Sequence, residues 1–104
     1  MPKIKLDSEY DDLDKYQFDD GSIMYYKKNT RVRHNPYGPA YISINGYKSY
    51  RINDVYHRLD GPAIIYSSGK EEYYINYEHL SKEQFEVHPD RLKFLGKEYL
   101  ICLK

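Results

Sequence analysis

The tetrad His57-Arg58-Leu59-Asp60 comes nearest to a catalytic motif, because its spacing matches the start of the catalytic loop of protein kinases. A phosphoryl-transfer site would also need a glycine-rich phosphate loop and a much longer fold than 104 residues can build. A local role fits the sequence better. Asp60 precedes Gly61, where its carboxylate can bond the backbone of a turn, and Arg58 can pair with it. We therefore predict that the tetrad is structural.

Metal-ligand spacings are incomplete in this chain. Asp7, Glu9 and Asp11 copy positions 1, 3 and 5 of a calcium loop, but Asp12 stands where the loop needs glycine. Phe18 stands where the loop needs a bidentate glutamate. We expect no calcium site.

Histidine and cysteine are equally unpromising as ligands or nucleophiles. His34, His57 and His79 recur along the chain, but no acidic or sulfur ligand recurs with them. Cys102 is the only cysteine and is expected to pack as a small apolar side chain. We therefore expect no metal, no cofactor and no enzymatic activity.

Composition sets broader limits. The length fits one domain, and a mean hydropathy of −0.88 leaves no apolar run long enough for a membrane span. The first residues are followed by acids rather than by a signal peptide, and a lone cysteine forms no internal disulfide, so we predict a cytoplasmic protein. The net charge is zero, yet residues 1–20 hold seven acids against three bases, whereas residues 21–58 hold seven bases against one acid.

An internal repeat of 23 residues positions most of these side chains. Nine identities pair His34, Gly38, Pro39, Ala40, Ile42, Gly46, Tyr50, Ile52 and Asn53 with His57, Gly61, Pro62, Ala63, Ile65, Gly69, Tyr73, Ile75 and Asn76. A degenerate earlier copy starts at Gly21, which gives about two and a half units. Each unit is predicted to form a β-hairpin, with a type I′ turn at Asn45-Gly46 and its counterpart at Ser68-Gly69.

Strand alternation sorts the repeat residues onto two faces. The core face is expected to carry Ala40, Ile42, Tyr50, Ile52, Ala63, Ile65, Tyr73 and Ile75. The opposite face then carries tyrosine, arginine and isoleucine side chains that must be covered by flanking segments, a second chain or a ligand.

The flanking segments complete a single predicted domain. Residues 1–20 form an acidic arm, either a short helix or a segment laid on the sheet, and residues 21–80 form the repeats. In residues 81–104, Ser81 and Gln84 form a capping box for a short helix that stops before His88-Pro89. Residues 91–95 and 98–102 are expected to close the fold as a hairpin. The predicted class is mainly β, a twisted antiparallel sheet of repeated hairpins.

The unit that runs from His57 through Asp60-Gly61-Pro62-Ala63 to Tyr73-Tyr74-Ile75-Asn76 resembles a degenerate MORN-like hairpin repeat of the HR-x-DGPA…YYIN type. Similar repeats occur in small proteins of phages, giant viruses and bacteria. The resemblance covers roughly residues 21–80 and implies a twisted sheet used for binding rather than catalysis.

Two binding functions remain open from the sequence. The first is a non-catalytic protein-interaction module, a small phage-type effector that inhibits or sequesters a host component, with homodimerisation through an open edge or apolar face as a further possibility. Its partner-binding residues would be Tyr41, Arg51, Ile64, Tyr66 and Tyr74. The alternative is a binder of single-stranded nucleic acid or a signalling nucleotide. Its anion-binding residues would be Tyr25, Tyr26, Lys27, Lys28, Arg31 and Arg33.

Overall fold

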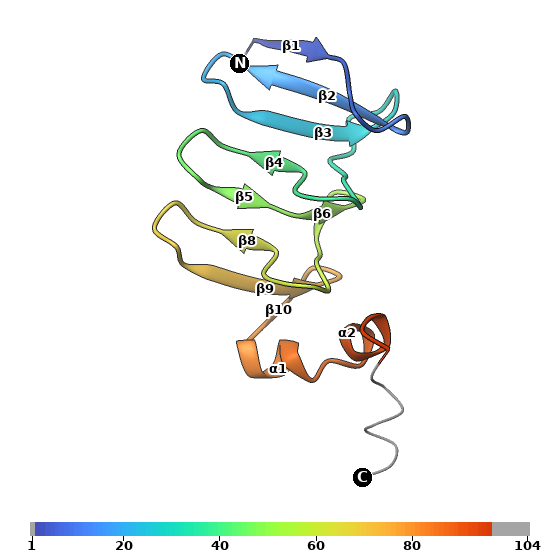
Figure 1. Ribbon diagram of the computed structural model, residues 1–104, viewed down its shortest axis with the longest axis vertical. Coiled ribbons are helices and arrows are strands. Elements are labelled where there is room, and N and C mark those ends of the chain that lie inside the picture. The colour runs from blue at the N-terminus through green and yellow to red at the C-terminus, as the bar shows by residue number, and fades with distance from the viewer. Residues whose placement is uncertain (1, 97–104) are drawn as a thin grey trace.

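The computed structural model describes residues 2–96 as a stack of β-hairpins that ends in two short helices (Figure 1). The strands are β1 (Lys3–Leu6), β2 (Leu13–Phe18), β3 (Ile23–Lys27), β4 (Tyr41–Ile42), β5 (Lys48–Ser49), β6 (Arg51–Ile52), β7 (Val55–Tyr56), β8 (Ile64–Ile65), β9 (Glu71–Ile75) and β10 (Glu78–Leu80). The helices are α1 (Lys82–Glu86) and α2 (Pro89–Phe94). The predicted mainly-β class is confirmed.

Eight strands form one open antiparallel sheet in the order β1-β2-β3-β4-β5-β8-β9-β10. Strands β6 and β7 form a separate short hairpin beside this sheet, and the helices lie at the β10 end (Figure 1). The molecule measures 53 × 31 × 19 Å with a radius of gyration of 15.4 Å. A compact domain of 100 residues has a radius of gyration of about 13 Å, so this fold is elongated.

Three hairpin turns share one hydrogen-bond pattern, which confirms the degenerate first copy. The N–H groups of Phe18, Ser43 and Tyr66 each donate to a carbonyl four residues later, at 2.8–2.9 Å. Each of these turns contains a glycine with positive φ, at Gly21, Gly46 and Gly69.

The predicted type I′ turn at Asn45-Gly46 is wrong, because Gly46 has a positive φ but Asn45 does not. A single left-handed glycine in a longer loop is typical of a type I turn with a bulge. Paired positive φ angles occur instead at Asn53-Asp54 and Asn76-Tyr77, where each return strand ends.

The assignment of the repeat residues to one shared face is confirmed. Ile42 lies opposite Lys48, and Lys48 lies opposite Ile65, so these side chains project to the same side. The expected burial of this face is confirmed only in part: Ala40, Ala63 and Ile75 are buried, whereas the other five are partly exposed, namely Ile42, Tyr50, Ile52, Ile65 and Tyr73. The buried core cluster of Ile75, Leu80 and Phe85 lies at the C-terminal end of the sheet.

The acidic stretch is part of the sheet rather than a helix. It contributes β2, which pairs with β1 on one side and β3 on the other. Asp14 is buried and accepts a hydrogen bond from the Asn29 N–H at 2.8 Å. That hydrogen bond, followed by the charge of Lys5 at 3.4 Å, lowers the pKa of the Asp14 carboxyl.

The two helices confirm one prediction and correct another. Ser81 and Gln84 form the capping box of α1, which ends before His88 as expected. Residues 91–95 were predicted to form a strand but belong to α2 and its C-terminal cap. His88 caps α2 and Pro89 occupies its first turn, a position that suits proline. Residues 98–102, the other arm of the expected hairpin, lie outside the described residues.

Candidate functional site

One face of the sheet carries a row of seven tyrosines. Along the register, Met24 lies opposite both Tyr16 and Tyr41, and Ser49 lies opposite both Tyr41 and Ile64. Opposed residues, and every second residue along a strand, share a face. We call this surface the tyrosine face; it comprises Tyr16, Tyr26, Tyr41, Tyr47, Tyr56, Tyr66 and Tyr74.

The tyrosine rings hold one another in place. Tyr47 meets Tyr41 and Tyr66 edge-to-face, with ring centroids 5.9 and 5.7 Å apart. The ring centroids of Tyr56, on β7, and Tyr74, on β9, lie 5.1 Å apart. The Tyr66 hydroxyl donates to the Glu72 carboxylate at 2.6 Å, and this bond raises the pKa of Tyr66 to about 12. The row is therefore fixed by mutual contacts before any ligand binds.

Three cations lie over tyrosine rings on the same face. The Lys3 Nζ is 4.6 Å from the Tyr16 ring centroid, the Arg51 guanidinium carbon is 4.0 Å from Tyr56, and the Lys70 Nζ is 5.7 Å from Tyr66. Such distances allow cation–π attraction. Within residues 2–96, none of these three cations has a carboxylate within 4.0 Å. The tyrosine face is therefore aromatic with incompletely neutralised positive charge.

The five predicted partner-binding residues all project to the tyrosine face. Tyr41, Arg51, Tyr66 and Tyr74 are partly exposed there, whereas Ile64 is only 3% exposed. Ile64 therefore supports the surface from below rather than offering contact area.

The sequence interpretation missed several members of this face. Tyr16, Tyr47, Tyr56, Lys3 and Lys70 were not singled out, and Tyr26 was assigned only to the alternative anion site. Tyr47 and Arg51 are four residues apart on the return strand, and residues an even number of positions apart share a face. This spacing alone would have predicted that Tyr47 lies on the tyrosine face. Tyr56 gave no such signal, because residues 53–60 were not predicted to form the β6–β7 hairpin.

The alternative anion-binding residues do not form one surface. Tyr25 and Tyr26 are neighbours on β3 and point to opposite faces. Tyr25 is buried, and its hydroxyl donates to the Glu9 carboxylate at 2.7 Å. The Arg33 Nε pairs with Asp54 at 2.7 Å. The remaining members are Lys27 on β3 and Lys28 and Arg31 in the loop that follows.

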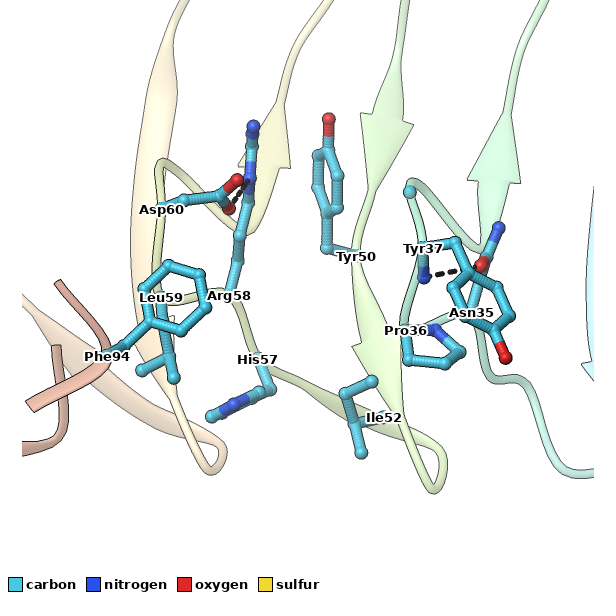
Figure 2. Close-up of a pocket in the computed structure, with 11 residues that line it drawn as sticks. Asn35, Pro36, Tyr37, Tyr50, Ile52, His57, Arg58, Leu59, Asp60 and Phe94 are labelled. Carbon is cyan, nitrogen blue, oxygen red and sulfur yellow. Dashed lines mark hydrogen bonds and ion pairs between the residues drawn. The ribbon is translucent and has the colours of Figure 1, made fainter.

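The opposite face contains a cleft of about 360 Å³ between successive units (Figure 2). Arg58 spans its wall, with its guanidinium 3.9 Å from the Tyr50 ring centroid and its Nε 2.8 Å from the Asp60 carboxylate. The Arg58 Nη1 also donates to the Pro62 carbonyl at 3.1 Å. These contacts tie Arg58 to the hairpin link, and the predicted pairing of Arg58 with Asp60 is confirmed.

The equivalent space in the next unit is filled by the chain itself. Tyr73 and Ile75 occupy the positions of Tyr50 and Ile52, and Phe85 packs on Tyr73 at a ring separation of 4.7 Å. The cleft in Figure 2 is thus the open copy of a site that α1 closes at the end of the array.

The recurring histidines bond to the backbone. The Nδ1 atoms of His34 and His57 accept hydrogen bonds from the N–H groups of Asn53 and Asn76, each at 2.9 Å. His79 pairs with Tyr74 in the register and stacks on its ring, so it does not continue this pattern. In the described part of the chain, no three His, Cys, Asp or Glu side chains cluster to hold a metal.

Comparison with protein-family models, curated proteins and solved structures finds no match for this chain. Within residues 2–96, no helix is both long and apolar enough to cross a membrane.

Proposed function

We propose that this chain is a non-catalytic protein-binding module whose tyrosine face contacts the partner. The observation that carries the proposal is the row of partly exposed tyrosines on a sheet that no second layer covers on this side within residues 2–96. Tyrosine and arginine are enriched among the residues that dominate binding energy at protein interfaces.

The fixed geometry of the row lowers the side-chain entropy that is lost when a partner binds. Tyrosine has few rotatable bonds, and contacts among Tyr41, Tyr47 and Tyr66 already restrict the rings. Little side-chain entropy is then lost when a partner covers the row.

A narrower proposal follows from the resemblance to viral hairpin repeats. In that version the partner is a host component, which the chain inhibits or sequesters by covering one of its surfaces.

Photo-crosslinking tests the tyrosine face directly. A benzoylphenylalanine is placed at Tyr41 or, as the control, at Lys48, which lies on the adjacent strand and projects to the opposite face. We expect a defined protein adduct from Tyr41 and none from Lys48. The purified partner should then lose affinity by at least about thirtyfold for Tyr41→Ala/Tyr66→Ala, the loss expected of a dominant contact of about 2 kcal/mol. Unchanged affinity in this variant would contradict the proposal.

A further inference from the structure

Within residues 2–96, no strand pairs with the outer edge of the sheet at β1. Among the strands that the structure describes, β1 is the terminal strand of the eight-stranded sheet and pairs only with β2 (Figure 1). At the other edge, the chain continues from β10 into α1, and Phe85 of α1 packs with Leu80 of β10. Ile4 is 65% exposed at the middle of β1. A free edge presents unpaired backbone groups that can template another strand.

The outward-facing backbone groups of β1 belong to its two lysines. The Phe18 N–H donates to the Ser22 carbonyl, so Phe18 is directed toward β3. Alternation then directs Gln17 toward β1, and Gln17 lies opposite Ile4 in the register. Ile4 is therefore directed inward, and the N–H and C=O groups of Lys3 and Lys5 are directed to the open edge.

The side chains of β1 alternate in chemistry as well as in direction. Lys3 and Lys5 project to the tyrosine face, whereas Ile4 and Leu6 project to the opposite face. Lys5 is paired with Asp14 at 3.4 Å, and Lys3 lies over Tyr16 with no carboxylate within 4.0 Å in the described chain. The edge is thus basic on one side and apolar on the other.

This pattern disfavours a second copy as the added strand. In an antiparallel pair of β1 strands, opposed residues share a face, so lysine would oppose lysine. Directly opposed like charges destabilise a strand pair. A strand with acidic residues at alternate positions and apolar residues between them would satisfy both faces.

We propose that a protein partner adds an extended strand to β1, with acidic side chains toward the tyrosine face and apolar side chains toward the other. The proposal rests on the protein-binding function above and assigns the partner's conformation and charge. A polypeptide supplies both donors and acceptors to the free edge, whereas a nucleic-acid backbone supplies phosphate acceptors only. Charge complementarity with Lys3, which unlike Lys5 has no carboxylate within 4.0 Å in residues 2–96, then selects acidic sequences.

A labelled peptide of alternating glutamate and valine is the probe, and its binding is measured by fluorescence anisotropy with the full chain. The comparison probes are the same peptide with lysine in place of glutamate, and single-stranded oligothymidine. We expect only the acidic peptide to bind, with amide chemical-shift changes concentrated in β1 and β2. Binding of oligothymidine alone, or no binding of the acidic peptide at low salt, would overturn the proposal.

Variants of Lys3 separate charge from backbone pairing. Lys3→Glu should lower the affinity for the acidic peptide about tenfold, since it replaces attraction by repulsion. Lys48→Glu should leave this affinity unchanged. Lys3→Pro should bind more weakly than Lys3→Ala, because both lose the charge but only proline lacks the outward N–H. Equal effects of Lys3→Glu and Lys48→Glu, or of Lys3→Pro and Lys3→Ala, would contradict strand addition.

The natural partner distinguishes this proposal from the broader one. If Tyr41→Ala/Tyr66→Ala abolishes partner binding but Lys3→Glu does not, strand addition at β1 is wrong and the tyrosine face stands. If the acidic peptide binds at β1 but the tyrosine variants retain the partner, the proposed use of the tyrosine face is wrong instead.

Discussion

At the scale of single residues, the histidines of the repeat show how one position stabilises a turn. His34 and His57 each accept a backbone hydrogen bond through Nδ1 from an asparagine that ends the same unit. Those asparagines, Asn53 and Asn76, have φ angles of 50° and 51°, in the left-handed region. An Nδ1 that accepts must be unprotonated, so the folded chain favours neutral histidine at both positions.

The free energy of unfolding should fall in mild acid because of these two residues. Burial lowers the pKa of both His34 and His57, whereas an unfolded histidine titrates at about 6.5. Above about pH 6.5 both states are neutral and the stabilisation is complete. As the pH falls below that value, the unfolded chain takes up protons first, and stability is lost until the folded pKa values are passed.

Urea unfolding at several pH values, followed by circular dichroism, measures this effect. The variant His34→Asn/His57→Asn replaces each imidazole by an uncharged side chain that keeps an acceptor oxygen. Its free energy of unfolding should depend less on pH across this window than that of the parent chain. An unchanged pH dependence would show that other groups cause the acid sensitivity.

At the scale of elements, the two segments that link successive hairpins, residues 35–39 and 58–62, form the same hydrogen bond with different side chains. The Asn35 Nδ2 donates to the Pro39 carbonyl at 3.0 Å, and the Arg58 Nη1 donates to the Pro62 carbonyl at 3.1 Å. The sequence difference between the two links therefore preserves this hydrogen bond to the proline carbonyl. The larger arginine needs more room, and Gly61 provides it.

The two equivalent glycines of these links should respond differently to substitution. A Cβ at Gly61 would lie 2.8 Å from the Arg58 guanidinium carbon, whereas a Cβ at Gly38 meets nothing closer than 3.9 Å. The clash falls on the movable end of Arg58, which can shift if it gives up its bond to the Pro62 carbonyl, so Gly61→Ala should lower the free energy of unfolding by about 1 kcal/mol. Gly38→Ala should leave it unchanged or raise it by up to about 1 kcal/mol, since alanine restricts the unfolded chain.

Chemical denaturation of four variants tests this difference: Gly38→Ala, Gly61→Ala, Arg58→Ala and the double variant Arg58→Ala/Gly61→Ala. In an Arg58→Ala background the clash is removed, so Gly61→Ala should cost much less than in the parent chain. A full cost in that background would place the strain elsewhere in the link.

Local patterns in the sequence predicted the elements where short-range chemistry decides. The repeat fixed the hairpin positions, and the capping box at Ser81 fixed the start of α1. The predicted strand over residues 91–95 is wrong, although His88 and Pro89 are recognisable helix-start residues. Alternation also assigned the two faces of the sheet, but it contains no information on which face α1 covers, since that packing is non-local.

At the scale of the whole molecule, each hairpin contacts its neighbours in a line rather than a shared central core. The strands of the main sheet pair in chain order, from β1 to β5 and then from β8 to β10, and the elongated shape agrees with this arrangement. In such arrays stability is approximately a sum of local terms and nearest-neighbour terms. Phe85 is buried at the C-terminal end, where it covers the last unit.

Phe85→Ala should therefore destabilise one end of the molecule more than the other. Removing a buried phenylalanine costs about 3–5 kcal/mol, and the loss should fall on the units that Phe85 covers. Native-state hydrogen exchange should show reduced protection of amides in β9 and β10, a smaller reduction in β8, and little change in β1 to β3. Phe94→Ala is the matched control, because Phe94 is 58% exposed and its loss should change stability by no more than about 0.5 kcal/mol. An equal loss of protection in every strand would mean that the chain opens as one cooperative unit, and the linear model of its stability would then be wrong.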